Sequence, residues 1–424
     1  MVEFFQTISD FLTGLGAPVL LPIIIILMGL VFGQKLGTAL RAGLTLGAAF
    51  IGLNLVIGLL IGTLSPAVES MVSATGSNLS ILDVGWGVAA AIAFGTSVGA
   101  LVILVSLGVN IVMLALRLTK TLNVDIWNFW NHAFTGSVTY LITGSLAYGL
   151  ICAGIHAALC LIIADRTAKR VQDFYGIPGI SIPHGWAITS VPIIAGVNWV
   201  LDRIPYVKDI VWNEKTIKDK WGIFGNPLIL GTILGIIIGL LGGMGKDIPG
   251  LLTLGITMGA VMILIPKIIG IFMESLTPIS DSAREFMSKH FKGREFYIGL
   301  DSALLIGHPV TVAAGIILIP IVLGLALILP GNRVLPFGDL AALFYFVAMV
   351  PFMSKGNLFR SVISGVVIMS LVLLILTSFG SSLTQMATSI GYDIPAEAVD
   401  ITAMSAGNWI TWVLYQVGRL FSGS

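Results

Sequence analysis

The sequence predicts an all-α integral membrane protein with about ten transmembrane helices and two re-entrant hairpins, arranged as two inverted five-helix repeats. Three observations lead to this fold class. Of the 424 residues, 56% are hydrophobic and only 10% are charged, whereas a soluble domain carries about 25% charged residues. Several apolar runs reach the roughly 20 residues that a helix needs to cross the bilayer. Two segments half a chain apart also resemble each other.

The expected spans follow the apolar runs along the chain. They cover residues 17–34, 40–63, 88–117, 138–164, 186–202, 224–243, 250–273, 303–330, 361–380 and 406–421. The 50 glycines fit helices whose backbones approach closely, because lipid provides little drive for helix association. The N-terminal segment is acidic and lacks a basic region followed by a cleavage site, so we expect no removable signal peptide.

Two apolar stretches are too short for a full span. Asp125–Thr135 places Asn and His among aromatic residues, and Asp339–Met353 runs into a polar Ser-Lys-Gly-Asn segment. Non-helical backbone at membrane depth is tolerated where it lines a polar cavity. We therefore predict two re-entrant hairpins, the first extending to Gly136.

The repeat rests on Gly43–Ser70, which aligns without a gap to Gly255–Ser282 at an offset of 212 residues, with ten of 28 positions identical. Further correspondences are Asp83 with Asp301, Asp125 with Asp339, and HGWAIT (184–189) with GNWIT (407–411). The alternative is chance similarity between segments rich in Gly, Ile and Leu. If the repeat is real, its halves are residues 1–212 and 213–424. Five spans in each half would place the second half upside down, as in many transporters.

Basic residues indicate the orientation, because short loops rich in Lys and Arg face the cytoplasm. With the N-terminus outside, the internal loops collect 13 basic residues and the external side collects eight. Two long charged loops, about 203–222 and 274–299, then face the cytoplasm. We expect these loops to form the docking surface for a soluble partner protein.

Three ionisable residues are the main candidates for a functional site, because such groups are costly inside lipid. His132 lies in the first predicted hairpin, His184 opens the fifth span, and Asp301 lies in an apolar stretch. The carboxylate of Asp301 could bind two hydroxyls, or take a proton from a hydroxyl that is being phosphorylated. We expect the three side chains to converge on one polar cavity. The alternatives are a helix-interface histidine at position 132 and a membrane-surface histidine at position 184.

Other polar residues near these positions are further candidates for substrate contact. Asp83 and Trp86 precede the third span, although Asp83 is alternatively a helix N-cap. The remaining candidates are Asn131, Thr135, Gly185 and His308, of which His308 alternatively only polarises the helix that follows it. His156 stands alone on an apolar face, where an interhelical hydrogen bond is the expected role.

Several functions are disfavoured by the sequence. It contains no GxxxxGK[ST] loop, so the chain is not expected to hydrolyse nucleotide, and any phosphoryl donor must be another protein. Cys152 and Cys160 lie eight residues apart in one apolar segment, and we expect inert core thiols there. We predict no cofactor, no bound metal and no nucleic-acid partner.

Five motifs resemble one known family. They are NVDIWNFWNHAFTG (123–136), IPHG (182–185), EFYIGLDSALLIGH (295–308), PGNRVLPFGDL (330–340) and KGNLFRSVISGVVIMS (355–370). Together they closely resemble the enzyme IIC component (EIIC) of the galactitol phosphotransferase system, in the ascorbate–galactitol transporter superfamily. The resemblance extends from about Leu12 to Gln416.

This resemblance implies a homodimer in the bacterial inner membrane whose protomers each have two domains. A V-shaped scaffold, about residues 12–64 and 224–273, would form the dimer contact. A mobile core, about residues 83–202 and 295–421, would hold the substrate and give alternating access by an elevator-like movement. The substrate would be a polyol, with galactitol as the leading candidate. It would be phosphorylated on delivery by a phosphocysteine of the cognate EIIB protein, and EIIA would take part indirectly.

The resemblance also assigns residues. His132, His184 and Asp301 match the family's cavity positions, and Asp83 and Trp86 match less closely. The chain would take part in a phosphotransferase reaction without carrying a phosphorylated residue itself. Two alternatives remain, namely an ion-coupled secondary transporter of a polyol or sugar acid without phosphorylation, and a membrane-embedded enzyme that acts on a lipid.

Overall fold

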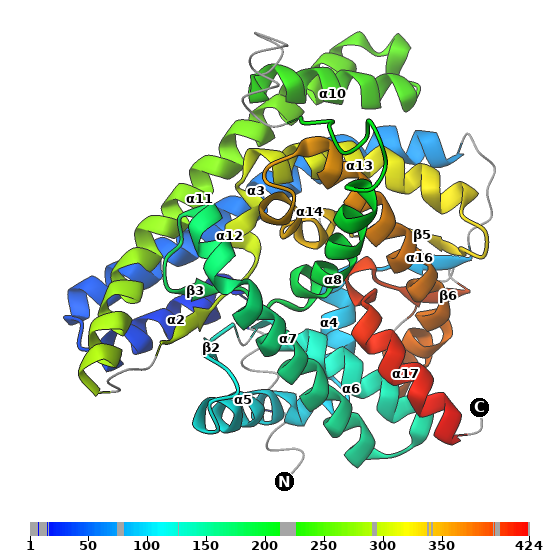
Figure 1. The fold of residues 1–424 in the computed structure, drawn as a ribbon. Helices are drawn as coiled ribbons and strands as arrows, with labels where there is room; N and C mark the ends of the chain where they lie inside the picture. The colour runs from blue at the N-terminus through cyan, green and yellow to red at the C-terminus, as the bar shows by residue number, and fades with distance from the viewer. Residues whose placement is uncertain are drawn as a thin grey trace.

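The computed structural model describes residues 7, 15, 17–73, 80–125, 127–212, 226–290, 295–336, 339–340, 342–392, 394 and 399–422. These residues are mostly helical (Figure 1). The helices are α2 (Ala17–Val31), α3 (Leu36–Ser73), α4 (Trp86–Phe94), α5 (Gly99–Ala115), α6 (Trp130–Thr143), α7 (Leu146–Tyr175), α8 (Gly185–Leu201), α10 (Pro227–Leu241), α11 (Ile248–His290), α12 (Ala303–Ile306), α13 (Pro309–Ile328), α14 (Ala342–Phe346), α15 (Val350–Met353), α16 (Leu358–Ser389) and α17 (Trp409–Ser422).

The membrane class predicted from the sequence is confirmed. Among the described residues, five helices are long and apolar enough to cross a bilayer, and α4 with α5 gives a sixth if that bent pair is one span. The five are Leu36–Val56, Leu146–Tyr175, Ile248–Ile265, Pro309–Ile328 and Leu358–Ser389. Four shorter apolar helices are Leu21–Val31, Gly185–Leu201, Leu228–Leu241 and Ala342–Met353. The total of ten spans stays a prediction.

Short strands, which the sequence did not predict, lie between the helices. They are β1 (Ile81–Asp83), β2 (Thr121–Asn123), β3 (Ile180–Ser181), β4 (Tyr297–Gly299), β5 (Val334–Leu335) and β6 (Asp400–Thr402). Within the described residues they form two parallel sheets, in the orders β5-β1-β6 and β2-β4-β3. Each sheet satisfies backbone N–H and C=O groups that could not remain unpaired in an apolar interior.

The order of elements recurs along the chain. The first half runs α2, α3, β1, α4, α5, β2, α6, α7, β3, α8, and the second runs α10, α11, β4, α12, α13, β5, α14 with α15, α16, β6, α17. Each sheet takes its central strand from one half and its two edge strands from the other. Neither half therefore completes a sheet alone.

Helices α2, α3, α10 and α11 form one layer along a side of the molecule (Figure 1). In α3, Gly43 and Gly47 allow close contact with α2. A Cβ atom at Gly43 would lie 2.8 Å from the carbonyl oxygen of Pro22, and one at Gly47 would lie 2.9 Å from that of Pro18. Side chains at these two positions would therefore force the helices apart.

The aligned glycines of α11 make the same kind of contact with α10. A Cβ atom at Gly255 would lie 3.0 Å from the carbonyl oxygen of Thr232, and one at Gly259 would lie 2.6 Å from that of Leu228. In both halves the partner carbonyls are four residues apart and occur in the reverse order to the glycines. The two glycine pairs that align in the sequence thus allow the same close contact with the preceding helix.

Helices α3 and α11 pack against each other in opposite directions. Arg41 Nη2 lies 3.4 Å from Glu274 Oε1. Further along α3, a Cβ atom at Gly52 would lie 3.8 Å from Ile268 Cδ1, which precedes Glu274 in α11. Residue numbers rise along one helix as they fall along the other, so the two helices are antiparallel.

Among the remaining helices, α6 packs against α4, α5, α7, α16 and α17. Large fully buried side chains lie in η1 (Trp127–Phe129), α6, α14 and α16. These side chains include Phe129, Trp130, Phe134, Phe344, Phe346 and Phe379. At the amino ends of β2 and β4, Lys120 Nζ lies 2.6 Å from Glu295 Oε2. The hydrogen bond from Lys120 lowers the pKa of Glu295, and the pair joins the two strands where they enter the sheet.

The expected span 88–117 is wrong as one helix, because α4 and α5 meet at 90°. The break lies at Gly95–Val98. Thr96 Oγ1 accepts a hydrogen bond of 3.0 Å from the backbone N–H of Gly99, so the hydroxyl caps the first turn of α5.

The expected span 138–164 and the first predicted hairpin, Asp125–Thr135, also have the wrong boundaries. Residues from Trp130 to Thr143 form one helix, α6, and the chain reverses afterwards. Gly144 adopts φ 66°, and Ser145 Oγ accepts from Tyr148 N to cap α7. A glycine in the left-handed region followed by a serine N-cap is a common way to end one helix and start another. Helices α6 and α7 therefore pack as a helical hairpin, and the re-entrant course of the first predicted hairpin stays a prediction.

The second predicted hairpin is closer to the structure, since Asp339–Met353 contains two short helices, α14 and α15, separated by a turn. The predicted charged loop 274–299 is wrong in its first part, which continues α11 to His290. The pair Glu285–Lys289 spans one helical turn there, at 2.6 Å. Residues 291–294, and 213–222 of the other predicted loop, lie outside the described residues.

The close contact between α10 and α11 gives a test by substitution. We expect Gly259→Ala to destabilise the protein by about 1–3 kcal/mol, because its Cβ atom would overlap the Leu228 carbonyl. Gly270→Ala in the same helix is the matched control, since a Cβ atom there meets nothing within 4 Å among the described residues. It should leave stability unchanged or raise it, because alanine favours a helix. Thermal unfolding in detergent measures both, and equal effects would contradict the close packing.

Candidate functional site

The carboxyl ends of β2, β3 and β4 bring three segments of the chain together. Asp125 follows β2, His184 follows β3 and Asp301 follows β4. Because the strands are parallel, their carboxyl ends meet at one edge of the sheet, the usual place for ligands in such sheets. All three side chains are buried, with exposed fractions of 1%, 1% and 8% in the order given.

One amide connects the two carboxylates of this cluster. Asn128 Nδ2 donates to Asp125 Oδ2 at 2.7 Å and to Asp301 Oδ2 at 2.9 Å. The other oxygen of Asp301, Oδ1, accepts from Ala303 N at 2.8 Å and lies 3.8 Å from His184 Nε2. That last distance is too long for a hydrogen bond but allows electrostatic interaction. The structure therefore brings His184 and Asp301 together, as predicted.

Several buried polar atoms around this cluster are available to a ligand. Among the described residues, the following atoms have no hydrogen-bond partner: Asp125 Oδ1, Asn131 Oδ1, both ring nitrogens of His184, Trp130 Nε1 and Trp186 Nε1. Buried polar groups are nearly always hydrogen-bonded in native proteins. The set combines acceptors with donors, which is what a molecule carrying several hydroxyl groups requires.

Aromatic rings form one wall of the cluster. The His184 ring stacks on Tyr345 with centroids 5.6 Å apart, and Trp186 meets Tyr345 edge-on at 5.2 Å. Trp186 also contacts Trp130 edge-on at 5.6 Å. The cluster thus combines buried polar side chains with aromatic rings that pack beside them.

The predicted residue Asn131 and its neighbour Gly185 lie beside the cluster. A Cβ atom at position 185 would lie 2.6 Å from Asn131 Cγ, so only glycine lets the start of α8 approach this amide. Asn131 Nδ2 donates to the carbonyl of Asn128 at 3.1 Å, and Oδ1 stays available. Both residues therefore fit the proposed cavity.

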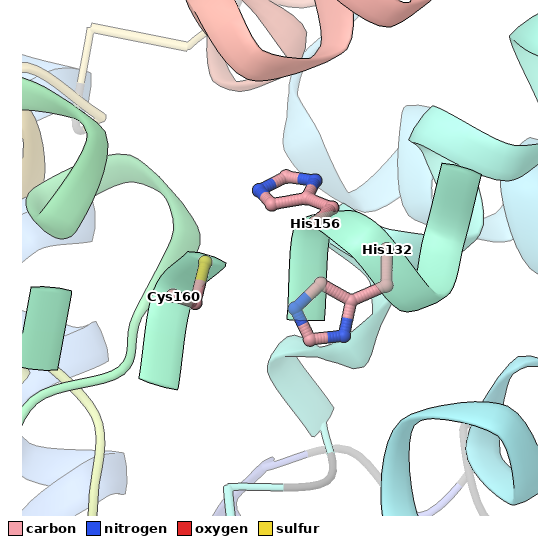
Figure 2. A group of neighbouring side chains, drawn as sticks. All are labelled: His132, His156 and Cys160. Carbon is pink, nitrogen blue, oxygen red and sulfur yellow. The ribbon is translucent and has the colours of Figure 1, made fainter. Parts of the chain in front are cut away.

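His132 and Thr135 belong to a different cluster. His132 Nδ1 lies 2.9 Å from Ser106 Oγ, and its ring is 5.1 Å from that of His156. Thr135 Oγ1 lies 2.7 Å from His156 Nδ1, which confirms the interhelical hydrogen bond expected for His156. Cys160 lies beside the two histidines (Figure 2). The contacts of His132 among the described residues include neither His184 nor Asp301, so the expected convergence of the three stays a prediction.

Asp83 and Asp339 form a counterpart cluster at the other sheet. Asp83 Oδ2 accepts from Asp339 N at 3.1 Å, while Oδ1 accepts from Gly85 N at 3.0 Å and Met404 N at 3.3 Å. Asp339 Oδ2 accepts from Ser405 N at 3.2 Å. The N-cap of α4 is Gly85, so the N-cap interpretation of Asp83 is wrong. Asp83 instead joins three separate backbone segments.

The last two predicted contacts lie outside the Asp301 cluster. Trp86 is the first residue of α4, and its backbone hydrogen-bonds to Asp339. His308 is the N-cap of α13, where Nδ1 accepts from Val310 N at 3.2 Å. The His308 ring packs against Phe174 of α7 at 5.0 Å. This capping role matches the alternative of a histidine that acts only on its helix.

Four residues of the cluster were missed as site residues from the sequence, namely Asp125, Asn128, Trp186 and Tyr345. A signal existed for the first two, since a three-residue spacing places Asp125 and Asn128 on one turn of a tight helix. Tyr345 comes from α14, far away in the chain, and its contribution depends on the tertiary fold.

Long apolar helices around a buried cluster of carboxylates, amides and aromatic rings define a polytopic membrane protein. The chain matches the family described as "PTS system sugar-specific permease component" (EIIC-GAT) over residues 10–397. It is 45% identical to a permease IIC component of Escherichia coli (strain K12) over 411 residues, which cover 97% of this chain and 94% of the relative.

Two further relatives are named "PTS system galactitol-specific EIIC component", one from Escherichia coli (strain K12) and one from Escherichia coli O157:H7. Each is 40% identical over 413 residues, which cover 97% of this chain and 91% of the relative. The chain therefore belongs to the galactitol-type EIIC permease family of the phosphotransferase system. Members of this family reside in the inner membrane, in agreement with the apolar helices.

The shared amide of Asn128 gives a test of the site's electrostatics. We expect Asn128→Ala to cost about 1–3 kcal/mol of stability, because two buried carboxylates lose their common donor. Adding Asp125→Asn should recover part of this loss, since it removes one of the two like charges. A double-mutant cycle from thermal unfolding in detergent should give a coupling energy of about 0.5–3 kcal/mol.

The matched control is Asn332→Ala, which removes a half-buried amide that donates to the carbonyls of Ala326 and Val334 near β5. Its effect should add to that of Asp125→Asn without coupling. Additive effects in the Asn128 cycle as well would mean that the amide does not link the two carboxylates.

Proposed function

We propose that this protein carries a polyol across the inner membrane and presents it for phosphorylation by the EIIB partner. Galactitol is the leading candidate for this polyol. The proposal of galactitol rests on the relatives named galactitol-specific, at 40% identity over nearly the whole chain. The observation that carries the site is the buried cluster of Asp301, His184 and Asn131 with its unpartnered donors and acceptors.

The chemistry of the cluster suits a polyol. A carboxylate accepts hydrogen bonds, an amide both donates and accepts, and an imidazole does either according to its tautomer. The rings of Trp186 and Tyr345 offer flat apolar faces beside these groups. A chain of carbons with a hydroxyl on each has the complementary pattern.

Asp301 is the proposed base in the phosphoryl transfer. The oxygen of a substrate hydroxyl would form a bond to phosphorus while the phosphorus–sulfur bond of the EIIB phosphocysteine breaks. The cysteine thiolate would leave with EIIB, and the Asp301 carboxylate would take the proton of the hydroxyl. The chain itself would carry no phosphoryl group.

We also propose that the two halves of the chain, 1–212 and 213–424, are inverted repeats. Four observations support this architecture: the repeated order of elements, the exchange of strands between sheets, the equivalent glycine contacts, and the antiparallel course of α3 and α11. An odd number of spans per half would produce the inversion.

An elevator-like movement is the proposed route of transport. The scaffold would include α2, α3, α10 and α11, and the core would include the rest. A small cavity of about 20 Å³ lies where Leu21 and Phe50 of the scaffold meet Asp301 and Leu304 of the core. Its lining is apolar apart from Asp301, which suits surfaces that slide past each other. Because the cluster is buried, the core would have to move for substrate to reach it.

The assembly proposed from the family resemblance is a homodimer joined through the scaffold. Leu44, Ile51 and Leu55 of α3 are 68%, 53% and 69% exposed, and such a face would contact a second copy or lipid. EIIB would dock on the cytoplasmic side, where residues 203–212 and the charged end of α11 would lie if the N-terminus is outside.

The experiment is uptake of radiolabelled galactitol into vesicles with and without EIIB. Phosphorylated product should appear only with phosphorylated EIIB. Asp301→Asn should reduce phosphorylation about 10²–10⁴-fold and change binding much less, because an amide still hydrogen-bonds but takes no proton. Asp173→Asn, on the surface of α7 and outside the proposed docking segments, is the control and should behave as wild type.

Other outcomes are equally informative. Equal loss of binding and phosphorylation would make Asp301 a binding residue only. Retained activity would remove Asp301 from the site. Galactitol accumulation that persists without the phosphoryl relay would favour the ion-coupled transporter.

A further inference from the structure

His132, His156 and Cys160 gather between α6 and α7. His156 and Cys160 are four residues apart and therefore share one face of α7, while His132 faces them from α6. One potential ligand atom from each residue lies within 4.8 Å of the other two. The side chains turn toward a common space (Figure 2). Their exposed fractions are 3%, 0% and 0%, so the group is fully buried.

A hydroxyl group lies within hydrogen-bond distance of Nδ1 in each of the two histidine rings. Ser106 Oγ lies 2.9 Å from His132 Nδ1, and Thr135 Oγ1 lies 2.7 Å from His156 Nδ1. Histidines that bind metals usually have the second ring nitrogen held in this way, which orients the ring and selects its tautomer. Two independent rings on two helices share the arrangement.

One tautomer of His156 satisfies all the contacts of the Thr135 hydroxyl. Thr135 Oγ1 lies 3.0 Å from the carbonyl oxygen of Asn131, 2.7 Å from His156 Nδ1 and 2.6 Å from Thr411 Oγ1. If its single proton goes to the carbonyl, the hydroxyl accepts from Nδ1–H of His156, and Nε2 of that ring keeps its lone pair. Within the described part of the chain this Nε2 has no hydrogen-bond partner, although it is fully buried. A buried lone pair that no donor satisfies is costly, and a metal ion would satisfy it.

We propose that His132, His156 and Cys160 bind one thiophilic transition-metal ion of the zinc or cuprous kind. Two imidazoles and one thiolate form a ligand set that selects these ions over the harder magnesium and calcium. With a cuprous ion and a thiolate, the charges cancel, which favours burial away from water. With Zn²⁺, a fourth ligand would complete the tetrahedron. This inference departs from the sequence-based expectation of an inert thiol at Cys160 and does not depend on the proposed substrate.

The ion would join α6 to α7 next to the cluster of Asp125, His184 and Asp301, which we call the polyol cluster. Asn131, which borders that cluster, immediately precedes His132 in α6. A bond from His132 to α7 would fix the rotation of α6 and with it the direction of the Asn131 amide. His132 would then support the site from behind rather than contact the substrate.

The test uses the full-length purified protein in detergent, with Co²⁺ as a spectroscopic probe under anaerobic conditions. We expect one Co²⁺ per chain and a thiolate-to-cobalt charge-transfer band in the wild type. Cys160→Ser should abolish the band. Cys152→Ser is the matched control, because Cys152 is also a free buried cysteine of α7 and lies outside the cluster. The control should retain the band in full.

A second variant tests whether the Thr135 hydroxyl beside His156 Nδ1 contributes to metal binding. Thr135→Val should weaken metal affinity about 10–100-fold without removing a ligand. Competition then distinguishes the ions: Zn²⁺ should displace Co²⁺ stoichiometrically, whereas a cuprous ion should be retained against a cuprous chelator. If Cys160→Ser fails to fold, X-ray absorption of the metal-loaded wild type should still detect one sulfur and two imidazole nitrogens around the ion.

Clear results would overturn the proposal. They are the absence of a charge-transfer band in folded wild type, a band that survives Cys160→Ser, or a band that Cys152→Ser removes. An X-ray absorption spectrum without a sulfur neighbour would be equally decisive.

Discussion

Backbone polar groups away from water must find partners, and the rest of this structure depends on how they do so. Helices satisfy their own N–H and C=O groups, but within the described residues six short strands lie between the helices. The two parallel sheets restore the lost hydrogen bonds. Each sheet also brings three chain segments to one edge, where side chains that follow the strands meet.

The exchange of strands between halves has a structural consequence. The central strand β4 belongs to the second half, while its neighbours β2 and β3 belong to the first. Asp301 therefore meets Asp125 and His184 only when both halves are in place. Neither half carries this cluster alone, so both halves of the chain are needed to form it.

Apolar composition and family motifs allowed the membrane class to be predicted, because hydropathy reports directly on the solvent of a helix. The pair His184 and Asp301 was also predictable, since ionisable groups in apolar runs are seldom without a function. The strands were not predictable, because two or three residues give no periodicity. The helix boundary at Gly144–Ser145 carried a recognisable signal that the apolar run concealed.

His132 shows what a sequence motif leaves open. It follows Asn131 directly, and consecutive residues on a helix point about 100° apart. Asn131 therefore borders the polyol cluster while His132 turns toward α7. A motif places both residues near the site, but only the rotation of α6 decides which one faces it. That rotation follows from packing against α7 and α8, which the linear sequence does not display.

The two carboxylate clusters occupy corresponding places in the two sheets, yet they differ in how they are satisfied. The oxygens of Asp83 accept three backbone N–H groups, one of them from Asp339. These are fixed donors that a substrate could not displace without breaking the fold. In the other cluster, Asp301 accepts one backbone N–H, from Ala303, and shares the side-chain amide of Asn128 with Asp125. Asp125 Oδ1 is free of partners within the described residues.

Side-chain donors can rearrange, and a free oxygen can bind a hydroxyl at no cost in lost contacts. The pair Asp83 and Asp339 thus holds backbone segments together at one sheet. The corresponding pair, Asp125 and Asp301, keeps one oxygen available for the proposed binding role at the other. If the halves derive from one ancestral unit, the difference follows from the segments after the edge strands. Backbone N–H groups of Met404 and Ser405 reach the carboxylates after β6, whereas the ring of His184 approaches them after β3. The proposed binding site therefore differs from its structural counterpart in the segments that follow the edge strands.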